Sequence, residues 1–206
     1  MMSCAGNPHL HTPAMDRLAA RGTRFERAYC TQPLCGPSRT SMQTGVYPHE
    51  AGVPFNFKED ECTCRPMPWL GGVLSAADYD TAYIGKWHLC DWPQNKHVHG
   101  YDTVFLGERP RLDDSLPPFC DEFFRRERDK PFAAVVSFLN PHDICQVARG
   151  DDLPHGNLPA PPPLDQCPEL PANFGVPAGE PDIIRQIQPR SPGAYPTADW
   201  EADDWR

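Results

Sequence analysis

The stretch that decides the fold of this chain reads LCGPSRTSMQTG and covers residues 34–45. Pro37 suits the first turn of a helix, and Gly45 suits the left-handed position just after the last turn. The polar run between them therefore predicts one short helix, with Cys35 just before its N-terminus. Unpaired N–H groups and the positive end of the helix dipole favour an anion there, and Arg39 adds a fork of donors one turn later. These features predict a nucleophile beside an anion cradle; a half-buried cysteine near a helix cap is the alternative.

The spacing Cys-x-Pro-Ser-Arg, followed by Thr-Ser-x-x-Thr-Gly, resembles the signature of the type I sulfatases. In that family a separate maturation enzyme oxidises the cysteine to formylglycine, and the hydrated aldehyde then attacks the sulfur of a sulfate ester. The resemblance implies a sulfuric ester hydrolase with a formylglycine made from Cys35, which would also be a calcium ligand. A cysteine-dependent phosphatase is the competing chemistry, but the loop of that family separates Cys and Arg by more than the three residues found here.

The segment before this stretch also looks like the lead-in of the family, through the run TPAMDRLAARGTRF at residues 12–25. Thr12 and Pro13 predict the start of a helix, Gly22 predicts its end, and its apolar residues fall on one face. Residues 23–30 then suit a short strand that leads into the cysteine loop. The resemblance therefore extends over about forty residues around the cysteine.

A second candidate segment follows the run TAYI, residues 81–84, which predicts a buried strand. The next residues read GKWHL, so Lys86 and His88 come just after the carboxyl end of the strand, where open α/β sheets bind ligands. By itself such a pair is most often solvated. However, GKWHL resembles a second sulfatase motif, in which the lysine holds the sulfate oxygens and the histidine supplies or accepts a proton. Cys90 stands where the family usually has glycine.

A third candidate segment comes directly after the apolar run at residues 132–139. That run predicts a central strand covered on both faces. Asn140-Pro141-His142-Asp143 follows, and Pro-His-Asp resembles a third element of the family, whose histidine contacts the sulfate group. The alternative is that His142 is an ordinary loop histidine. Asp143 either orients a histidine or caps a turn.

The remaining segments are interpreted as structural. Residues 70–77 and 117–128 predict helices, and residues 46–69 and 95–107 predict loops, with His97 and His99 at the surface. In the second helix the phenylalanines are expected to face inward and the arginines to face solvent; these residues are Phe119, Phe123, Phe124, Arg125, Arg126 and Arg128.

Composition limits the classes of partner. The net charge is −9, with no basic stripe interleaved with aromatic residues, which argues against a nucleic-acid partner. No apolar run is long enough to span a membrane. Because the overall field does not attract anions, a sulfate site needs its own local cations. The nine cysteines include no Cys-x-x-Cys pair, so neither a zinc ribbon nor a thioredoxin motif is predicted.

The domain organisation changes near residue 150. Residues 1–150 predict a partial catalytic domain of the α/β class, with the mixed sheet flanked by helices of the alkaline-phosphatase-like superfamily. Residues 151–206 contain twelve of the 26 prolines and carry three arginines against ten acidic residues. This composition predicts an extended segment or a low-complexity linker, and Thr197 predicts the start of a final helix.

The resemblance also implies features that the chain lacks. Sulfatases begin with a strand that ends in calcium-binding aspartates and take further ligands from a strand far downstream, so the chain is expected to be truncated at both ends. Most calcium ligands would lie outside it, and little turnover is expected from residues 1–206 alone. Location in the periplasm or secretion is expected if a signal peptide lies upstream.

The resemblance assigns roles to five residues. Cys35, as formylglycine, attacks sulfur; Arg39 orients it; Lys86 and His142 bind sulfate oxygens; and His88 transfers a proton. Two other functions remain open at this point. One is hydrolysis of phosphate or phosphonate esters by a member of the same superfamily, and the other is a sulfatase remnant without catalytic activity.

Overall fold

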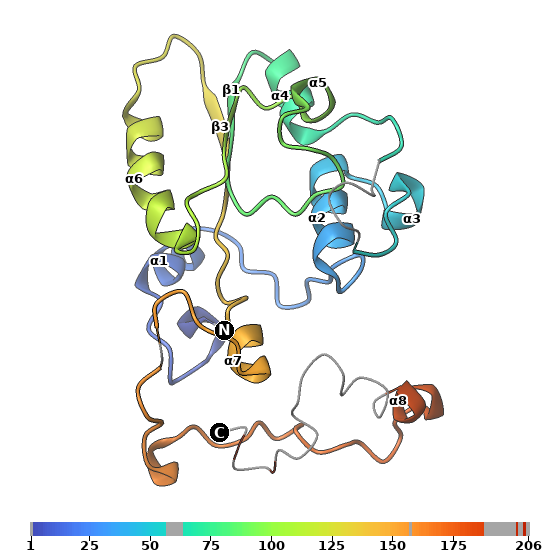
Figure 1. The fold of residues 1–206 in the computed structure, drawn as a ribbon, viewed down its shortest axis with the longest axis vertical. Coiled ribbons are helices and arrows are strands. Elements are labelled where there is room, and N and C mark those ends of the chain that lie inside the picture. Colours follow the sequence, from blue (N-terminus) through green and yellow to red (C-terminus); the bar gives the residue numbers. More distant parts are fainter. Residues whose placement is uncertain (1, 57–63, 157, 188–200, 202–203, 205–206) are drawn as a thin grey trace. The chain divides into compact units, whose positions relative to one another are not determined.

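The computed structural model describes residues 2–56, 64–156, 158–187, 201 and 204 (Figure 1). The chain divides into two compact units, residues 29–144 and residues 1–28 together with residues 145–206. All five candidate site residues belong to the unit at 29–144. The predicted α/β class is confirmed in this unit, because helices flank a small parallel sheet.

The sheet contains three described strands in the order β2-β1-β3. They are β1 (Asp80–Gly85), β2 (Thr103–Phe105) and β3 (Phe132–Ser137). Both β2 and β3 pair with β1 in parallel, and the register with β3 runs from Asp80 opposite Phe132 to Gly85 opposite Ser137. The carboxyl ends of β1 and β3 therefore lie side by side. The predicted buried strand at 81–84 is confirmed, but the prediction that 132–139 is central was wrong: β1 is central, and β3 is at the edge of the described sheet.

Helices cover both faces of the sheet (Figure 1). Helix α6 (Leu112–Arg125) lies on one face, while α4 (Leu70–Ala76) and α5 (Lys96–His99) lie on the other. Alternate residues of β1 point to opposite faces, so Ile84 contacts α6 and Tyr83 contacts an aromatic cluster beside α4.

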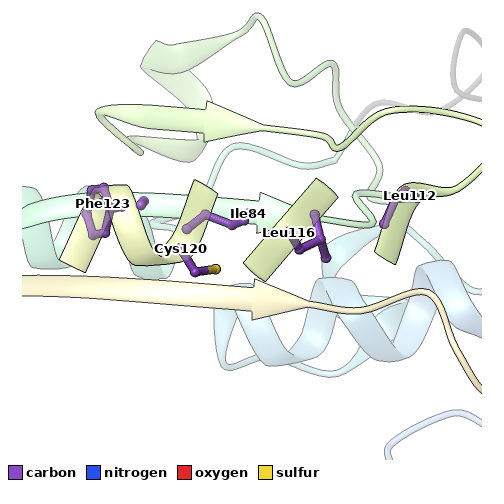
Figure 2. Packing of buried hydrophobic residues seen from close by; sticks show 6 residues of the cluster. Ile84, Leu112, Leu116, Cys120 and Phe123 are labelled. Carbon is purple, nitrogen blue, oxygen red and sulfur yellow. The ribbon is translucent and has the colours of Figure 1, made fainter. Parts of the chain in front are cut away.

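The core under α6 is apolar. Its buried members recur on one face of the helix at a spacing of three to four residues (Figure 2) and are Leu112, Leu116, Cys120 and Phe123, packed on Ala82 and Ile84 of β1. The second cluster consists of Trp69, Tyr83, Trp87, Leu89 and Tyr101. The two clusters pack on opposite faces of β1. This packing fixes the strand that leads to the candidate site.

Helix α6 corrects one sequence prediction. It begins at Leu112 and ends at Arg125, whereas residues 117–128 were predicted, because Pro117 marks the second turn of this helix and not its start. The side chain of Arg128, expected in solvent, is only 9% exposed: it forms an ion pair with Asp80 and lies 4.3 Å from the ring centroid of Phe123. A guanidinium can be buried in this way because the ring face and the carboxylate both compensate its charge.

Two predicted loops contain regular structure. Residues 46–69 include α3 (Pro48–Ala51), and residues 95–107 include α5 and β2. Conversely, the strand predicted at 23–30 is absent from these residues, which form bends and irregular backbone. His97 is exposed as expected, but the prediction that His99 lies at the surface was wrong, because its side chain is fully buried.

The other unit contains short helices. They are η1 (Ser3–Ala5), α1 (Pro13–Arg21), η2 (Leu164–Gln166), α8 (Asp182–Ile187) and α7 (Ile144–Arg149), whose first residue belongs to the unit at 29–144. The predicted start and end of α1 are confirmed, yet none of its residues is buried. None of the described side chains in 151–186 is buried either. The helix predicted from Thr197 lies outside the described residues, and none of the described helices is long and apolar enough to cross a membrane.

Candidate active site

Helix α2 (Cys35–Thr44) positions the candidate nucleophile. Leu34 is the N-cap, so the helix begins at Cys35, three residues before the polar run at 38–44 for which it was predicted. Pro37 occupies the third helical position. At the other end Gly45 adopts φ 73° and its N–H donates to the carbonyl of Ser41 at 2.8 Å, as predicted. Cys35 is therefore held by the first turn of a regular helix.

The first turn of α2 offers fewer free donors than the sequence suggested. The N–H of Gly36 donates to Oδ1 of Asn56 at 2.8 Å, and the N–H of Ser38 donates to the carbonyl of Leu34 at 3.0 Å. Pro37 has no N–H to donate. The prediction of a cradle of unpaired N–H groups is therefore wrong at Gly36 and Ser38, and an anion beside them must take its charge from side chains.

Cys35 itself is half-buried and its thiol is not in a disulfide. The neighbouring Gly36 is in close contact with other segments: a Cβ at this position would lie 3.2 Å from Oδ1 of Asn56 and 3.9 Å from the carbonyl oxygen of His88. The start of α2 thus packs beside the backbone that carries His88. Asn56 was not identified from the sequence, since no local pattern connects it with the cysteine.

Arg39 links α2 to the ends of both β1 and β3. Its Nη1 donates to Oγ of Ser137 at 2.8 Å, to the carbonyl of Lys86 at 3.1 Å and to the hydroxyl of Tyr83 at 3.4 Å. All three acceptors are neutral, and no carboxylate among the described residues pairs with this guanidinium. A half-buried cation with neutral partners keeps its charge available for an anion.

The backbone of Lys86 is fixed from several sides. Its N–H donates to the carbonyl of Ser137 at 2.8 Å, and its own carbonyl accepts from Arg39 and, at 2.8 Å, from the hydroxyl of Tyr83. Burial raises the pKa of Tyr83, with the Arg39 charge opposing this effect, so the phenol stays a donor. Gly85 allows the approach, because a Cβ there would lie 2.2 Å from the carbonyl oxygen of Ser137.

His88 follows in an unusual backbone conformation. Its φ is 44°, in the left-handed region that residues other than glycine rarely adopt. The buried Trp87 stabilises this turn, since its Nε1 donates to the carbonyl of Asp91 at 2.7 Å and its ring packs between Trp69 and Tyr83. Such backbone strain persists only where the surroundings over-determine it, and it is concentrated at functional sites.

His142 lies on an exposed turn after β3. The carboxylate of Asp113 on α6 holds this turn by accepting from the backbone N–H groups of Leu139 and Asn140. Asp143 caps the turn, because its N–H donates to Oδ1 of Asn140 at 3.3 Å and its Oδ2 accepts from Nδ2 of Asn140 at 3.0 Å. Of the two roles considered for Asp143, the structural one is present. That the His142 side chain approaches Cys35 stays a prediction.

The structure therefore brings α2, Arg39 and the backbone of Lys86 and His88 together. The described residues contain no group of three or more His, Cys, Asp or Glu side chains that could hold a metal ion. Because calcium takes six to eight oxygen ligands, a single ligand at position 35 does not make a calcium site within these residues.

Comparison with known proteins places the chain in a family. A model of the sulfatase family matches residues 1–180. The chain is 34% identical to an N-acetylglucosamine-6-O-sulfatase of Bacteroides thetaiotaomicron, over 68% of this chain and 28% of that protein. It is 30% identical to a Delta 4,5-hexuronate-2-O-sulfatase of the same organism, over 80% of this chain and 36% of that protein.

The fold agrees with this comparison. A solved structure of a 2-O GAG sulfatase superposes with a TM-score of 0.73 at 26% identity, over 98% of this chain and 45% of that one. The chain spans about a third of the length of the curated relatives it matches, at 28% and 36% of their sequences. Members of the family generally use formylglycine and calcium. Since the family model covers most of the 206 residues, the chain belongs to the sulfatase family.

Proposed function

We propose that this protein is a sulfuric ester hydrolase that uses a formylglycine made from Cys35. The observation that carries the proposal is the position of Arg39: a half-buried guanidinium, one helical turn after Cys35, whose partners are neutral groups at the carboxyl ends of β1 and β3. A cation arranged in this way favours a tetrahedral dianion such as sulfate beside the nucleophile.

The residues have separate roles in the proposed reaction. The maturation enzyme would oxidise the Cys35 thiol to an aldehyde with loss of its sulfur, and the aldehyde is then hydrated. One hydroxyl of the hydrate attacks the sulfur of the ester, the S–O bond to the alcohol breaks and the alcohol leaves with a proton; the second hydroxyl then loses its proton and expels sulfate as the aldehyde re-forms. Arg39 orients this group and offsets its charge. Lys86 and His142 bind sulfate oxygens, which stabilises the charge that develops in the transition state, and His88 supplies or accepts a proton.

The proposal includes calcium, but most of the calcium ligands would have to come from residues outside 1–206. Position 35 is the one predicted calcium ligand among the described residues, and residues outside 1–206 would supply the others. No step above is therefore derived through the metal. The substrate is proposed to be a sulfated saccharide, because the two relatives named above are sulfatases of an N-acetylglucosamine and of a hexuronate.

The maturation step can be tested on the chain itself. We expect coexpression with a formylglycine-generating enzyme to convert Cys35 to the aldehyde, which mass spectrometry detects in the tryptic peptide of residues 28–39. Cys30 lies in the same peptide and is the internal control: it keeps its thiol if conversion depends on the signature. An unmodified Cys35 under these conditions would favour the remnant without catalytic activity.

Anion binding provides a test that does not need the modification. We expect sulfate to raise the unfolding temperature of the chain, and we expect Arg39→Met to abolish most of this shift. Arg125→Met is the matched control, because Arg125 pairs with Asp121 on the exposed face of α6 at 2.8 Å. Equal loss of the shift in both variants would contradict a role for Arg39 in binding.

Catalysis and its specificity are measured on the full-length protein. Hydrolysis of an aryl sulfate, lost in Cys35→Ala, is the expected result. Preference for an aryl phosphate over the sulfate would instead identify a phosphate ester hydrolase of the same superfamily.

A further inference from the structure

A buried network connects α2 with the segment that carries Lys86 and His88. We propose that Gln43, Tyr101 and His99 are positioning residues, which hold the helix of the nucleophile and residues 86–91 in a fixed relation to each other. The inference rests on the proposed function for the identity of the site, while its evidence is the geometry of the network.

The contact with α2 is a buried hydrogen bond. The hydroxyl of Tyr101 donates to Oε1 of Gln43, and the two residues are 1% and 6% exposed. Gln43 lies about two turns after Cys35 on the same helix. Burial raises the pKa of Tyr101, so its hydroxyl stays a donor. Because water does not reach these atoms, removal of one partner leaves the other unsatisfied.

The contact with residues 86–91 is aromatic. The ring of His99 is fully buried and meets Trp87 edge to face, with 5.1 Å between ring centroids. Trp87 stands between Lys86 and His88 in the chain, and it also contacts Tyr83 at 4.7 Å. Tyr83 in turn contacts Tyr101 at 5.5 Å. The rings therefore form a continuous layer from the Lys86–His88 segment to the partner of α2.

The hydrogen bonds of His99 define its protonation state. The N–H of Tyr101 donates to Nδ1 at 3.0 Å, so Nδ1 carries no proton. Nε2 lies 3.0 Å from the carbonyl oxygen of Pro93, so it must carry one. His99 is thus neutral and joins the Pro93 loop to the backbone of Tyr101. A proton added at Nδ1 would remove the acceptor for Tyr101 and bury a charge.

Several charged groups surround this ring. Burial is the main influence and lowers the pKa of His99; the charge of Asp91 opposes it, and Lys96 and His97 reinforce it. Gly71 allows the backbone of His99 to lie close to α4, because a Cβ at Gly71 would lie 2.4 Å from the carbonyl oxygen of His99. The network consequently has little room to rearrange when one hydrogen bond is lost.

The first experiment measures the position of the nucleophile. Under native conditions, well below the unfolding temperature, we expect Tyr101→Phe to raise the rate at which iodoacetamide alkylates Cys35 by about fivefold, with no change at the exposed Cys30. Peptide mass spectrometry separates the two sites. Tyr79→Phe is the matched control, because the Tyr79 hydroxyl makes no hydrogen bond among the described residues. An unchanged Cys35 rate in Tyr101→Phe would overturn the proposal.

The second experiment tests His99. Nitrogen-15 NMR is expected to find the proton on Nε2, and to find that His99 is still neutral at pH 6.5, its ordinary pKa. His99→Asn, which can keep an acceptor near Nδ1, should leave the Cys35 rate closer to that of the native chain than His99→Leu does. Protonation of His99 at its ordinary pKa of 6.5, or equal effects of the two variants, would overturn the assigned role.

The buried, neutral form of His99 also determines how the stability of the chain depends on pH. The unfolded chain binds a proton at His99 near its ordinary pKa of 6.5, whereas the folded chain binds it only at lower pH. The free energy of unfolding therefore decreases as pH falls below about 6.5, and His99→Asn should reduce this decrease. A variant with the same pH dependence as the native chain contradicts the buried neutral state.

These measurements need neither formylglycine nor turnover. If Tyr101→Phe raises the alkylation rate of Cys35 but the protein hydrolyses no sulfate ester, only the proposed function is contradicted. If the alkylation rate of Cys35 does not change in Tyr101→Phe, only the positioning network is contradicted.

Discussion

The strands β1 and β3 end side by side, yet they fix the residues that follow them by different means. After β1, Lys86 is held by hydrogen bonds to its N–H and its carbonyl, and Trp87 anchors the next turn in a buried aromatic cluster. After β3, His142 lies on an exposed turn that the carboxylate of Asp113 holds.

This difference separates two ways of placing a functional side chain. The end of β1 is fixed by packing, so a change of shape should disturb it most. The turn after β3 is attached to α6 through the carboxylate of Asp113, beside the local Asn140–Asp143 hydrogen bonds, so removal of that carboxylate should disturb it while the core stays folded. Two of the family motifs are thus held differently, the first by packing and the second by hydrogen bonds to polar side chains.

The largest effect is expected from Gly85→Ala. Gly85 has φ 105°, and its Cβ would lie 2.2 Å from the carbonyl oxygen of Ser137 and 2.9 Å from Cδ1 of Leu116. Backbone strain and overpacking each cost of the order of 1–3 kcal/mol, so the free energy of unfolding should fall by at least about 2 kcal/mol. Urea denaturation followed by the fluorescence of the buried Trp69 and Trp87 measures the change.

Gly45→Ala is the control for this prediction. Gly45 also has a positive φ, 73°, but nothing lies within 4 Å of its Cβ position. Only the conformational cost of about 1 kcal/mol should appear. Equal losses in the two variants would mean that the close contact between β1 and β3 contributes nothing.

An intermediate effect is expected from Asp113→Ala. The variant leaves the N–H groups of Leu139 and Asn140 without their acceptor, and a hydrogen bond to a charged group contributes about 2 kcal/mol. Hydrogen exchange of these two amides should become faster, and exchange in β1 should not change. Affinity for sulfate should fall if His142 contacts the anion.

Asp114→Ala is matched to it in position. Asp114 lies in the same first turn of α6 and shares the interaction with the helix dipole, but its carboxylate pairs with Arg111 at the surface. We expect a change of at most about 0.5 kcal/mol and no faster exchange at residue 139. Faster exchange there in Asp114→Ala would contradict the role given to Asp113.

Much of the fold could be predicted because its signals are local. Pro13, Gly45 and the apolar run at 81–84 each mark a boundary or an element within a few residues, and the structure confirms them. The start of α6 was missed because the helix begins before two prolines that normally indicate a start. The order of the strands depends on pairing between segments that are distant in the sequence, so no local pattern predicts which strand is central.

The site was predictable to the same extent. The resemblance implied that Arg39 and Lys86 lie at one site, and the structure places the Arg39 guanidinium against the backbone carbonyl of Lys86. That the Lys86 side chain faces the same site stays a prediction. The partners that fix the site were missed, since Asn56 and Asp113 reach it from distant loops and helices. His99 was placed at the surface because its neighbours are polar, whereas its burial depends on aromatic residues far away in the sequence.

The smallest effect is expected from Ser137→Ala, which tests whether Arg39 joins the two strand ends. The variant removes the 2.8 Å hydrogen bond from Nη1, while the carbonyl of Lys86 and the hydroxyl of Tyr83 remain as acceptors. Stability should fall by about 1 kcal/mol or less. Ser137→Thr keeps the hydroxyl and should restore the stability. If Ser137→Ala instead costs as much as Gly85→Ala, Arg39 depends on the end of β3 rather than on β1, and the contrast between packing and hydrogen bonds to polar side chains does not hold.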